Sequence, residues 1–275
     1  MDTSAVTSDD PASVIWVARH GERADVDPEW ERTAERPHDP PLTPMGRLQA
    51  DATARVLVDE RIDVVYSSPF LRCLETAAAV AKLRGLRIRV EPGLAELLNP
   101  RWFTSHPVDH AMSDTALVAA LGDGAHMVEH QYVPVFDTVA RRGEELDGAS
   151  SAIQALTFPE TPMEAADRYE YTLRAVQRAS PYSLIVTHGF GVQAIAETCN
   201  GVEVIECDYC ALTRLRRNRS NSEAGDEEDP TAALWYCDVL CRSTHTEALT
   251  PPEEAAREPS ASAPEDTRAA NGNGA

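Results

Sequence analysis

Short runs of β-branched and aliphatic residues alternate along this chain with longer stretches of helical periodicity, and this alternation constrains the fold most. The runs stand at 14–18, 64–66, 86–90 and 183–187. Their length and composition are typical of strands buried on both faces of a parallel sheet. The order strand, helix, strand, helix predicts an α/β fold with a doubly wound, mostly parallel sheet flanked by helices.

Capping residues mark where the intervening helices begin. The pairs Thr-Pro at 43–44 and Ser-Pro at 68–69 each predict an N-cap followed by a first-turn proline. The sequence TPME at 161–164 predicts a capping box. A fourth helix is expected to follow His188 and to end near Gly201.

The chain divides into one domain with flexible ends. We expect a disordered N-terminus at 1–12, a domain at 13–242 and a disordered acidic tail at 243–275, because the tail has almost no large apolar residues. Residues 97–150 interrupt the alternation with Gly, Pro and aromatic residues, which indicates a cap inserted over the carboxyl-end crevice of the sheet. The acidic stretch 217–230 lies between two strand-like segments and is interpreted as a loop.

Charge and composition exclude several function classes. The 275 residues carry 25 basic and 45 acidic side chains, a net charge of −20, and all the basic residues except Lys82 are arginines. Such a field repels nucleic acid and anionic membranes, so neither is expected as a partner, and any bound anion must be held by clustered arginines. The first residues lack the pattern of a targeting signal, and six cysteines are too few for a disulfide scaffold. These features favour the cytoplasm.

Basic and imidazole side chains cluster at the predicted strand ends. Arg19, His20 and Arg23 follow the first strand, and His188 follows the strand at 183–187. Arg72 falls in the first turn of a helix, where backbone amides already favour an anion. Because parallel strands end at one edge of the sheet, these side chains are expected to share one crevice. Guanidinium groups bind phosphate oxygens bidentately, so the cluster predicts a phosphate site.

The motifs at these positions resemble those of a known family. Over about residues 13–241, the chain is similar to the histidine phosphatase, or phosphoglycerate-mutase-like, superfamily, and most of all to the phosphatase domain of the suppressors of T-cell receptor signalling. The motifs that carry the resemblance are RHGER at 19–23, LTPMGRLQA at 42–50, SSPFLRCLETA at 67–77, VEPGLAE at 90–96, ETPMEAADR at 160–168 and VTHG at 186–189.

The resemblance implies a role for each matched residue. His20 would be the nucleophile that forms a phosphohistidine, and His188 would be a further donor to the transferring group. Arg19, Arg23 and Arg72 would bind the phosphate oxygens. Glu96 would act as general acid for the leaving alcohol and then as base for water.

The residues alone leave the identity of the proton donor open. Glu96 lies in a loop, and Glu22 and Glu129 are alternatives. If Glu96 is the acid, its pKa is expected to be raised and activity to be best below neutral pH. The cationic neighbours of His20 are expected to lower its pKa and keep one nitrogen free at pH 7.

Two patterns imitate metal sites, but we expect no metal and no cofactor. The sequence HMVEH at 126–130 matches a zinc-peptidase pattern, although its flanks leave little room for the long helix that such a site requires. Cys207, Cys210, Cys237 and Cys241 have the spacing of zinc ligands, yet they stand in apolar strand segments and are expected to pack as small hydrophobic residues.

The sequence therefore predicts a phosphatase, specifically a metal-independent phosphomonoester hydrolase working through a phosphohistidine at His20. The alternatives are a phosphoglycerate-type mutase and a non-catalytic scaffold that binds phosphoproteins. The expected substrate is a phosphorylated small molecule or a phosphotyrosine-type protein. Aromatic residues of the insertion are predicted to form the surface that receives a flat leaving group, namely Trp102, Phe103, Tyr132 and Phe136.

Overall fold

The computed structural model describes residues 13–34, 36–103, 121–137, 154–199, 202–203, 206–217 and 235–249. Its main strands are β1 (Ser13–Arg19), β2 (Val64–Ser67), β3 (Ile88–Val90), β6 (Tyr182–Thr187), β7 (Leu212–Arg217) and β8 (Trp235–Arg242). They form one six-stranded sheet in the order β3, β2, β6, β1, β7, β8. Two further strands, β4 (Phe136–Asp137) and β5 (Gln154–Ala155), pair with each other.

The sheet is mixed but mostly parallel. Strands β3, β2, β6 and β1 run parallel to one another. Strand β7 pairs antiparallel with β1, and β8 pairs antiparallel with β7. The predicted α/β fold class is therefore confirmed, with an antiparallel pair added at one edge.

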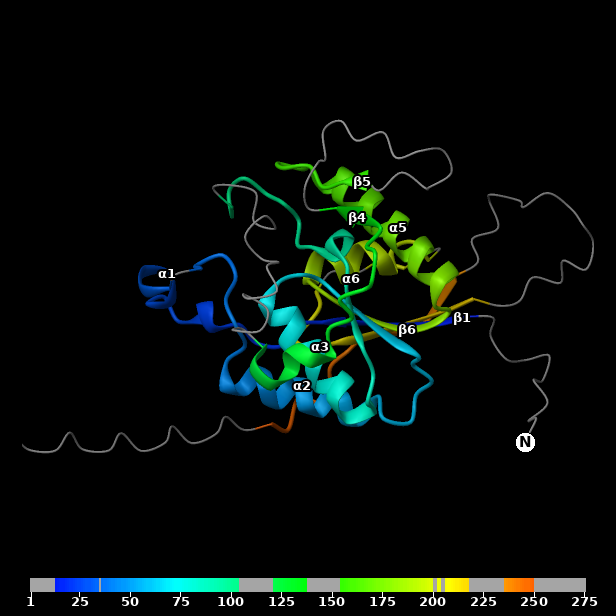
Figure 1. Ribbon diagram of the computed structural model, residues 1–275, viewed down its shortest axis with the longest axis horizontal. Coiled ribbons are helices and arrows are strands. Elements are labelled where there is room, and N and C mark those ends of the chain that lie inside the picture. The colour runs from blue at the N-terminus through cyan, green and yellow to red at the C-terminus, as the bar shows by residue number, and fades with distance from the viewer. Residues whose placement is uncertain are drawn as a thin grey trace, which may run out of the picture.

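Helices cover both faces of this sheet (Figure 1). The helices α2 (Pro44–Val56) and α3 (Leu71–Arg84) lie on one face, and α5 (Pro162–Ala179) and α6 (Gly189–Ala196) lie on the other. Shorter elements are η1 (Ala24–Val26), α1 (Trp30–Thr33), η2 (Pro92–Leu94) and η3 (Gly122–Met127). The predicted doubly wound arrangement follows from this layering.

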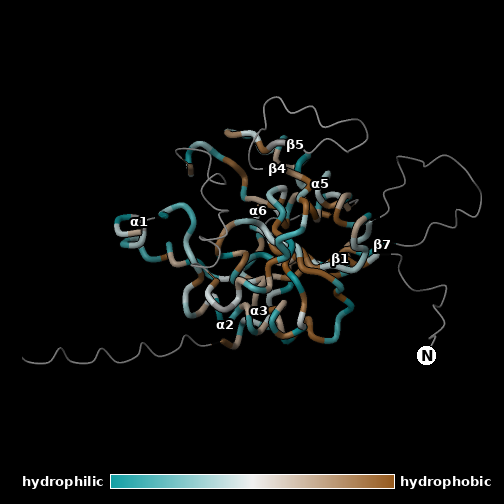
Figure 2. The backbone as a smooth tube through the Cα atoms, in the orientation of Figure 1, coloured by the Kyte–Doolittle hydropathy of each residue, from teal (hydrophilic) through white to brown (hydrophobic). Residues whose placement is uncertain are grey.

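The alternation of side chains along β1 produces a core on each face. Trp16 and Ala18 pack in the cluster that includes residues of α2 and α3, whereas Ile15 and Val17 pack in the cluster with residues of α5 and α6. Successive strand residues point to opposite faces, so a strand that is apolar throughout is buried on both sides. Figure 2 shows the hydrophobic residues concentrated in the centre of the molecule, where the strands lie.

Two of the three predicted caps are present. The hydroxyl of Thr43 accepts a hydrogen bond from the amide of Gly46 at 2.9 Å and caps α2. Thr161 and Glu164 form a reciprocal capping box at the start of α5. These local contacts fix the starts of helices on opposite faces of the sheet.

The predicted cap of α3 is wrong. This helix begins at Leu71 with Phe70 as the N-cap residue and no side-chain cap from it. The amide of Leu71 instead donates to Oδ1 of Asp39 at 2.7 Å, so a distant carboxyl satisfies the helix start. Ser68 is thereby free for a different contact, described below. The helix after His188 is also shorter than expected, because α6 ends at Ala196.

The structure moves the predicted start of the tail. Residues 243–249, expected to be disordered, form hydrogen-bonded turns after β8. Within them, Nε2 of His245 lies 3.0 Å from the hydroxyl of buried Thr53, and the hydroxyl of Ser243 donates to Asp208 at 2.8 Å. The predicted disordered N-terminus, the acidic loop at 218–230, the tail from 250 and parts of the insertion lie outside the described residues.

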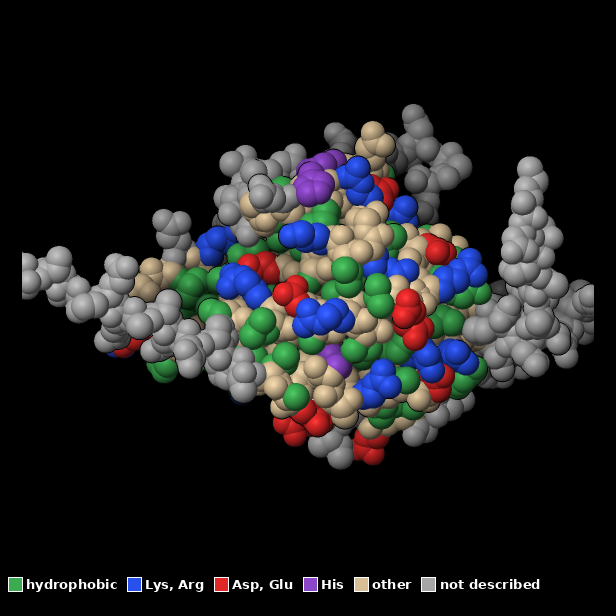
Figure 3. All heavy atoms as spheres, turned by 90° about the horizontal axis from the view of Figure 1, so that it is seen from below, with side chains coloured by type: hydrophobic (Ala, Val, Ile, Leu, Met, Phe, Trp, Pro, Cys, Tyr) green, Lys and Arg blue, Asp and Glu red, His purple; other side chains and the backbone are tan. Residues whose placement is uncertain are grey.

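Positive and negative side chains are mixed on the surface of the described part of the chain. On the face shown in Figure 3, Lys and Arg side chains are interspersed with Asp and Glu. At the arginine-rich end of β7, Arg214 and Arg216 both contact Asp238 of β8, at 2.8 and 3.2 Å. None of the helices that the structure describes is long and apolar enough to cross a membrane.

Candidate active site

Three adjacent parallel strands end at one point, and the residues that follow them meet there. Strands β2, β6 and β1 are neighbours in the sheet, and they are followed by Ser68, His188 and His20. The imidazole rings of His20 and His188 lie with centroids 5.4 Å apart. The crevice predicted from the strand ends is thus present, with both histidines in it.

His20 is held in one tautomer by its own backbone. Its Nδ1 lies 2.7 Å from the carbonyl oxygen of Gly21, and because a carbonyl only accepts, Nδ1 carries the hydrogen. The lone pair is therefore on Nε2. Burial lowers the pKa of His20 well below its usual value, and the charges of Arg72, Arg19 and Arg23 lower it further. A neutral, nucleophilic imidazole is the result near neutral pH.

The turn after β1 packs directly on the start of α2. A Cβ atom on Gly21 would lie 2.6 Å from the carbonyl oxygen of Gly46, and a Cβ on Gly46 would lie 2.2 Å from that of Glu22. The amide of Gly21 donates to the hydroxyl of Thr76 at 3.1 Å. This close backbone contact requires glycine at both positions and sets the place of His20.

Arg72 and Arg19 each have buried donor atoms without a partner. In Arg72, which is 2% exposed, Nη2 lies 3.2 Å from Nδ1 of His188, whereas Nε and Nη1 have no hydrogen-bond partner. Arg19 donates from Nη1 to the carbonyl of Cys207 at 2.5 Å and stacks on the ring of Tyr209, while its buried Nε is unpartnered. Buried N–H groups are rarely left unpaired, so this cluster is suited to bind an anion.

Arg23 stands at the rim of the same cluster. Its side chain is 34% exposed, and its Nε lies 2.9 Å from Oδ1 of Asp25. Its charge contributes to the lowered pKa of both His20 and His188. The structure therefore brings all three predicted arginines to the crevice, with Arg72 buried and Arg19 and Arg23 partly exposed.

Of the three candidate proton donors, Glu96 contacts His188 and Arg72 in the crevice, whereas Glu22 and Glu129 have other partners. An oxygen of Glu96 lies 3.3 Å from Nδ1 of His188 and 3.8 Å from Nη2 of Arg72. Burial raises the pKa of Glu96 despite the opposing charge of Arg72. Glu22 instead accepts from the hydroxyl of Thr43, and Glu129 forms an ion pair with Arg89 of β3.

Two residues of the site were missed by sequence reasoning. The hydroxyl of Ser68 lies 2.8 Å from Nε2 of His188, a contact hidden because Ser68 matched a helix cap. Oδ1 of Asp39 accepts from the amide of Leu71 and lies 4.0 Å from Nη1 of Arg72. Asp39 stands in a loop far along the chain from Arg72, and no local pattern signals such a contact.

The predicted aromatic surface is largely wrong. Phe103 and Phe136 are buried in a cluster with Phe70, and the hydroxyl of Tyr132 donates to buried Glu91 at 2.6 Å. Of that set only Trp102 is well exposed. The insertion buries these rings because they complete the packing around Phe70. An aromatic residue that sequence reasoning did not select, Tyr209, lies 5.8 Å from the ring of His20.

The two metal-like patterns have other structural settings. The short helix η3 ends at Met127, so His126 and His130 do not share one helical turn. Cys207 and Cys210 are buried, and Cys237 and Cys241 are half-buried on β8. Among the described residues, no three His, Cys, Asp or Glu side chains are grouped to hold a metal ion.

Comparisons with known proteins fit this geometry. The model of the histidine phosphatase superfamily (branch 1) matches residues 15–146. The putative phosphoserine phosphatase 2 of Hydrogenobacter thermophilus is 36% identical over 222 residues, which cover 77% of this chain and 88% of that protein. The chain belongs to the histidine phosphatase superfamily. Family membership and the phosphatase name of this relative support the predicted enzyme class, a phosphatase.

Two further matches show how much of this chain, and of each similar protein, the similarity covers. Ubiquitin-associated and SH3 domain-containing protein A of Homo sapiens is 25% identical over 226 residues, covering 78% of this chain and 29% of that protein. The chain thus spans less than a third of that human relative. The solved structure of Bacillus stearothermophilus YhfR has a TM-score of 0.53 at 20% identity and covers 85% of this chain and 99% of that one, which supports the shared fold.

Proposed function

We propose that this protein is a metal-independent phosphomonoester hydrolase in which His20 takes the phosphoryl group. The observation that carries the proposal is that one crevice holds both a lone pair on Nε2 of His20 and buried N–H groups of Arg19 and Arg72 that have no partner. Such groups bind phosphate oxygens and stabilise the charge that develops on them during transfer. The arginines thereby supply the positive charge that the reaction needs.

The first step transfers the phosphoryl group to the enzyme. Nε2 of His20 attacks phosphorus, a P–N bond forms and the P–O bond to the leaving alcohol breaks. Glu96, whose pKa is raised by burial, gives its proton to the leaving oxygen. Protonated Glu96 is required at this step, so turnover of alkyl phosphates is expected to be faster below neutral pH than above it.

The second step regenerates the enzyme. Water attacks phosphorus, its proton goes to the carboxylate of Glu96, and the P–N bond breaks so that His20 recovers its lone pair. His188 is proposed to donate to the transferring group. A guanidinium only donates, so Nδ1 of His188 accepts from Nη2 of Arg72 and the ring hydrogen is on Nε2, beside the hydroxyl of Ser68, which supports this role.

The proposed substrate is a phosphorylated small molecule or a phosphotyrosine-type protein. Tyr209 supports an aromatic leaving group, since its ring lies 5.8 Å from that of His20 and carries the stacked guanidinium of Arg19. The phosphoserine phosphatase name of the bacterial relative supports a small alkyl phosphate equally well. The cytoplasm is the proposed location.

Hydrolysis of p-nitrophenyl phosphate in the presence of EDTA tests the proposal. The purified protein is expected to release phosphate under these conditions, and His20→Ala is expected to abolish that release. The matched control is His245→Ala, which removes an imidazole that lies outside the crevice against Thr53. Full activity of His20→Ala would overturn the proposal, and so would an intact enzyme that releases no phosphate from any monoester.

A further inference from the structure

Arg168 of α5 is buried at 5% exposure and uses all of its nitrogens as donors. Its Nε and Nη2 donate to the two carboxylate oxygens of Glu160, at 3.1 and 2.6 Å. Its Nη1 donates to the carbonyls of Gly93 and Ala95, at 2.7 and 3.0 Å, and Nη2 lies 3.4 Å from the carbonyl of Glu96. One guanidinium therefore contacts three backbone carbonyls, those of Gly93, Ala95 and Glu96, in the segment that presents Glu96.

Neighbouring side chains hold the same segment. An oxygen of Glu160 accepts from the amide of Leu98 at 2.8 Å. The hydroxyl of Tyr169 donates to the carbonyl of Ala95 at 2.5 Å, and the hydroxyl of Thr187 donates to the carbonyl of Leu94 at 2.9 Å. Residues 93–98 are thus anchored from α5 on one side and from the end of β6 on the other.

We propose that Arg168, together with Glu160, is a positioning residue that keeps the carboxyl of Glu96 beside His188. This inference rests on the proposed role of Glu96 as proton donor. Residues 95–99 form neither helix nor strand, so their backbone groups need partners from outside the segment. A small displacement of this loop would move the carboxyl out of reach of the leaving oxygen.

The chemistry of this contact explains why an arginine occupies the position. Several carbonyl oxygens and a carboxylate converge on one buried point, and only a planar guanidinium offers donors in enough directions. The carboxylate of Glu160 balances the positive charge at that point. The segment is therefore held through its backbone, while in the side chain of Glu96 Oε1 accepts from the amide of Leu97 at 3.1 Å and the other oxygen faces His188.

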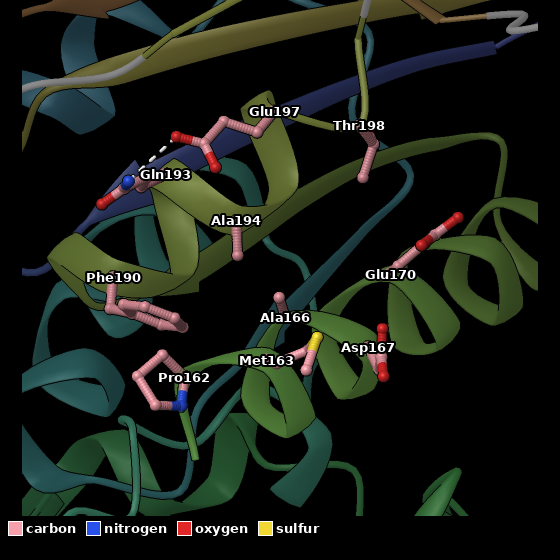
Figure 4. Close-up of a pocket in the computed structure, with 10 residues that line it drawn as sticks. All are labelled: Pro162, Met163, Ala166, Asp167, Glu170, Phe190, Gln193, Ala194, Glu197 and Thr198. Atoms are coloured by element: carbon pink, nitrogen blue, oxygen red, sulfur yellow. Dashed lines mark hydrogen bonds between the residues drawn. The ribbon is translucent and has the colours of Figure 1, made fainter.

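The opposite face of α5 provides a matched control. Met163, Ala166, Asp167 and Glu170 line a groove of about 400 Å³ against α6, and no residue of the candidate active site lines it (Figure 4). On that side Arg174 makes an exposed ion pair with Glu170 at 2.5 Å. Arg174→Met therefore removes an arginine and one ion pair from the same helix without touching the segment 93–98.

Two substrates with different leaving groups can distinguish a positioning role of Arg168 from a general structural role. A p-nitrophenolate ion leaves without a proton, whereas the alkoxide of phosphoserine needs one. Arg168→Met is expected to reduce kcat/KM for phosphoserine by about tenfold or more beyond its effect on p-nitrophenyl phosphate, because kcat/KM ends with the first transfer and excludes the shared step in which Glu96 acts as base. Glu96→Gln is expected to show the same imbalance, and Arg174→Met to change neither rate. Equal losses on both substrates in Arg168→Met would overturn the proposal.

Hydrogen exchange tests the contact without turnover. In Arg168→Met the amides of residues 93–98 are expected to exchange faster, while those of β1 and β2 keep their protection. If Arg168→Met does not fold, Glu160→Gln tests the same segment. This substitution removes the charge that pairs with Arg168 and keeps the shape of the side chain. Unchanged exchange at 93–98 would overturn the positioning role. Inactivity of the wild-type enzyme would instead overturn the proposed function. Hydrogen exchange would then still test whether Arg168 holds residues 93–98 in place.

Discussion

Two buried arginines of this molecule, Arg72 and Arg168, have nearly the same exposure, 2% and 5%, but very different surroundings. Arg168 donates from every nitrogen to protein oxygens. Arg72 keeps Nε and Nη1 without partners and has its carboxylates no closer than 3.8 Å. The first is therefore satisfied by the fold, and the second is available to a ligand.

The two arginines therefore differ in what they contribute to stability. Burying a charged group is costly unless it is paired and hydrogen-bonded, so a well-paired arginine contributes to folding while an underpaired one does not. A phosphate would complete the hydrogen bonds of Arg72. The same residue type thus completes the fold in one place and keeps donors available in the other.

The largest expected effect is on the stability of Arg168→Met. Removing one partner of a buried, hydrogen-bonded ion pair is expected to lower the free energy of unfolding by about 3–5 kcal/mol. Urea unfolding measures this loss. The control Arg174→Met breaks an exposed pair and is expected to lose only about 0.3–0.5 kcal/mol. Similar losses in the two variants would show that the Arg168 contacts are not stabilising.

Arg72→Met is expected to show the opposite division between activity and stability. Loss of its donors to the phosphate should reduce kcat/KM by about 10²–10³-fold. Its free energy of unfolding should change by about 1 kcal/mol or less, because the side chain makes one hydrogen bond in the fold, to His188. Steady-state kinetics and urea unfolding of one preparation measure both. A loss of stability matching that of Arg168→Met would show that the fold depends on both arginines alike.

A smaller effect is expected in the pH dependence of stability. The pKa of His20 is about 6.5 in the unfolded chain and is lowered in the folded protein. At pH values between these two pKa values, the imidazole is protonated in the unfolded chain but neutral in the folded protein. Stability is therefore full above about pH 6.5 and falls with decreasing pH by up to about 1.4 kcal/mol per pH unit for this group.

His20→Asn removes this contribution and should make the acid-side decline shallower. Urea unfolding at several pH values between 7.5 and 5.5 provides the comparison. Glu96, whose raised pKa acts in the opposite direction, is present in both proteins and cancels in the difference. The same slope in both proteins would contradict the lowered pKa of His20.

The smallest effect is expected at the start of α5, the helix that carries Arg168. Thr161→Ala removes the capping box and is expected to cost about 1 kcal/mol in thermal or urea unfolding. The segment 93–98 should keep its protection from hydrogen exchange, since the cap does not contact it. Loss of protection there would mean that the cap and the Arg168 contacts act as one unit.

Much of the fold could be predicted because its signals are local. Four strands and the helices between them follow from the alternation of buried runs and capped periodic stretches, and parallel strands then bring His20 and His188 together. The helix caps at Thr43 and Thr161 are confirmed because they depend only on residues a few positions away.

Contacts between distant segments escaped prediction because no local pattern reports them. Ser68 was interpreted as a helix cap, yet its partner His188 lies in another strand–helix turn. Arg168 did give a signal: it shares the buried face of α5 with Ala165, Thr172 and Val176, where a charged residue needs a partner. The identity of that partner depends on how the loop at 93–98 packs, which only the folded chain determines.

Trapping the phosphorylated enzyme during turnover tests whether His20 is the nucleophile. Rapid mixing with a phosphomonoester, quenching in alkali and mass spectrometry of the digested protein would locate the phosphoryl group. We expect it on the imidazole of His20, bound through Nε2, and absent from His20→Asn. A phosphoryl group on another residue, or undiminished turnover by His20→Asn, would show that His20 is not the nucleophile.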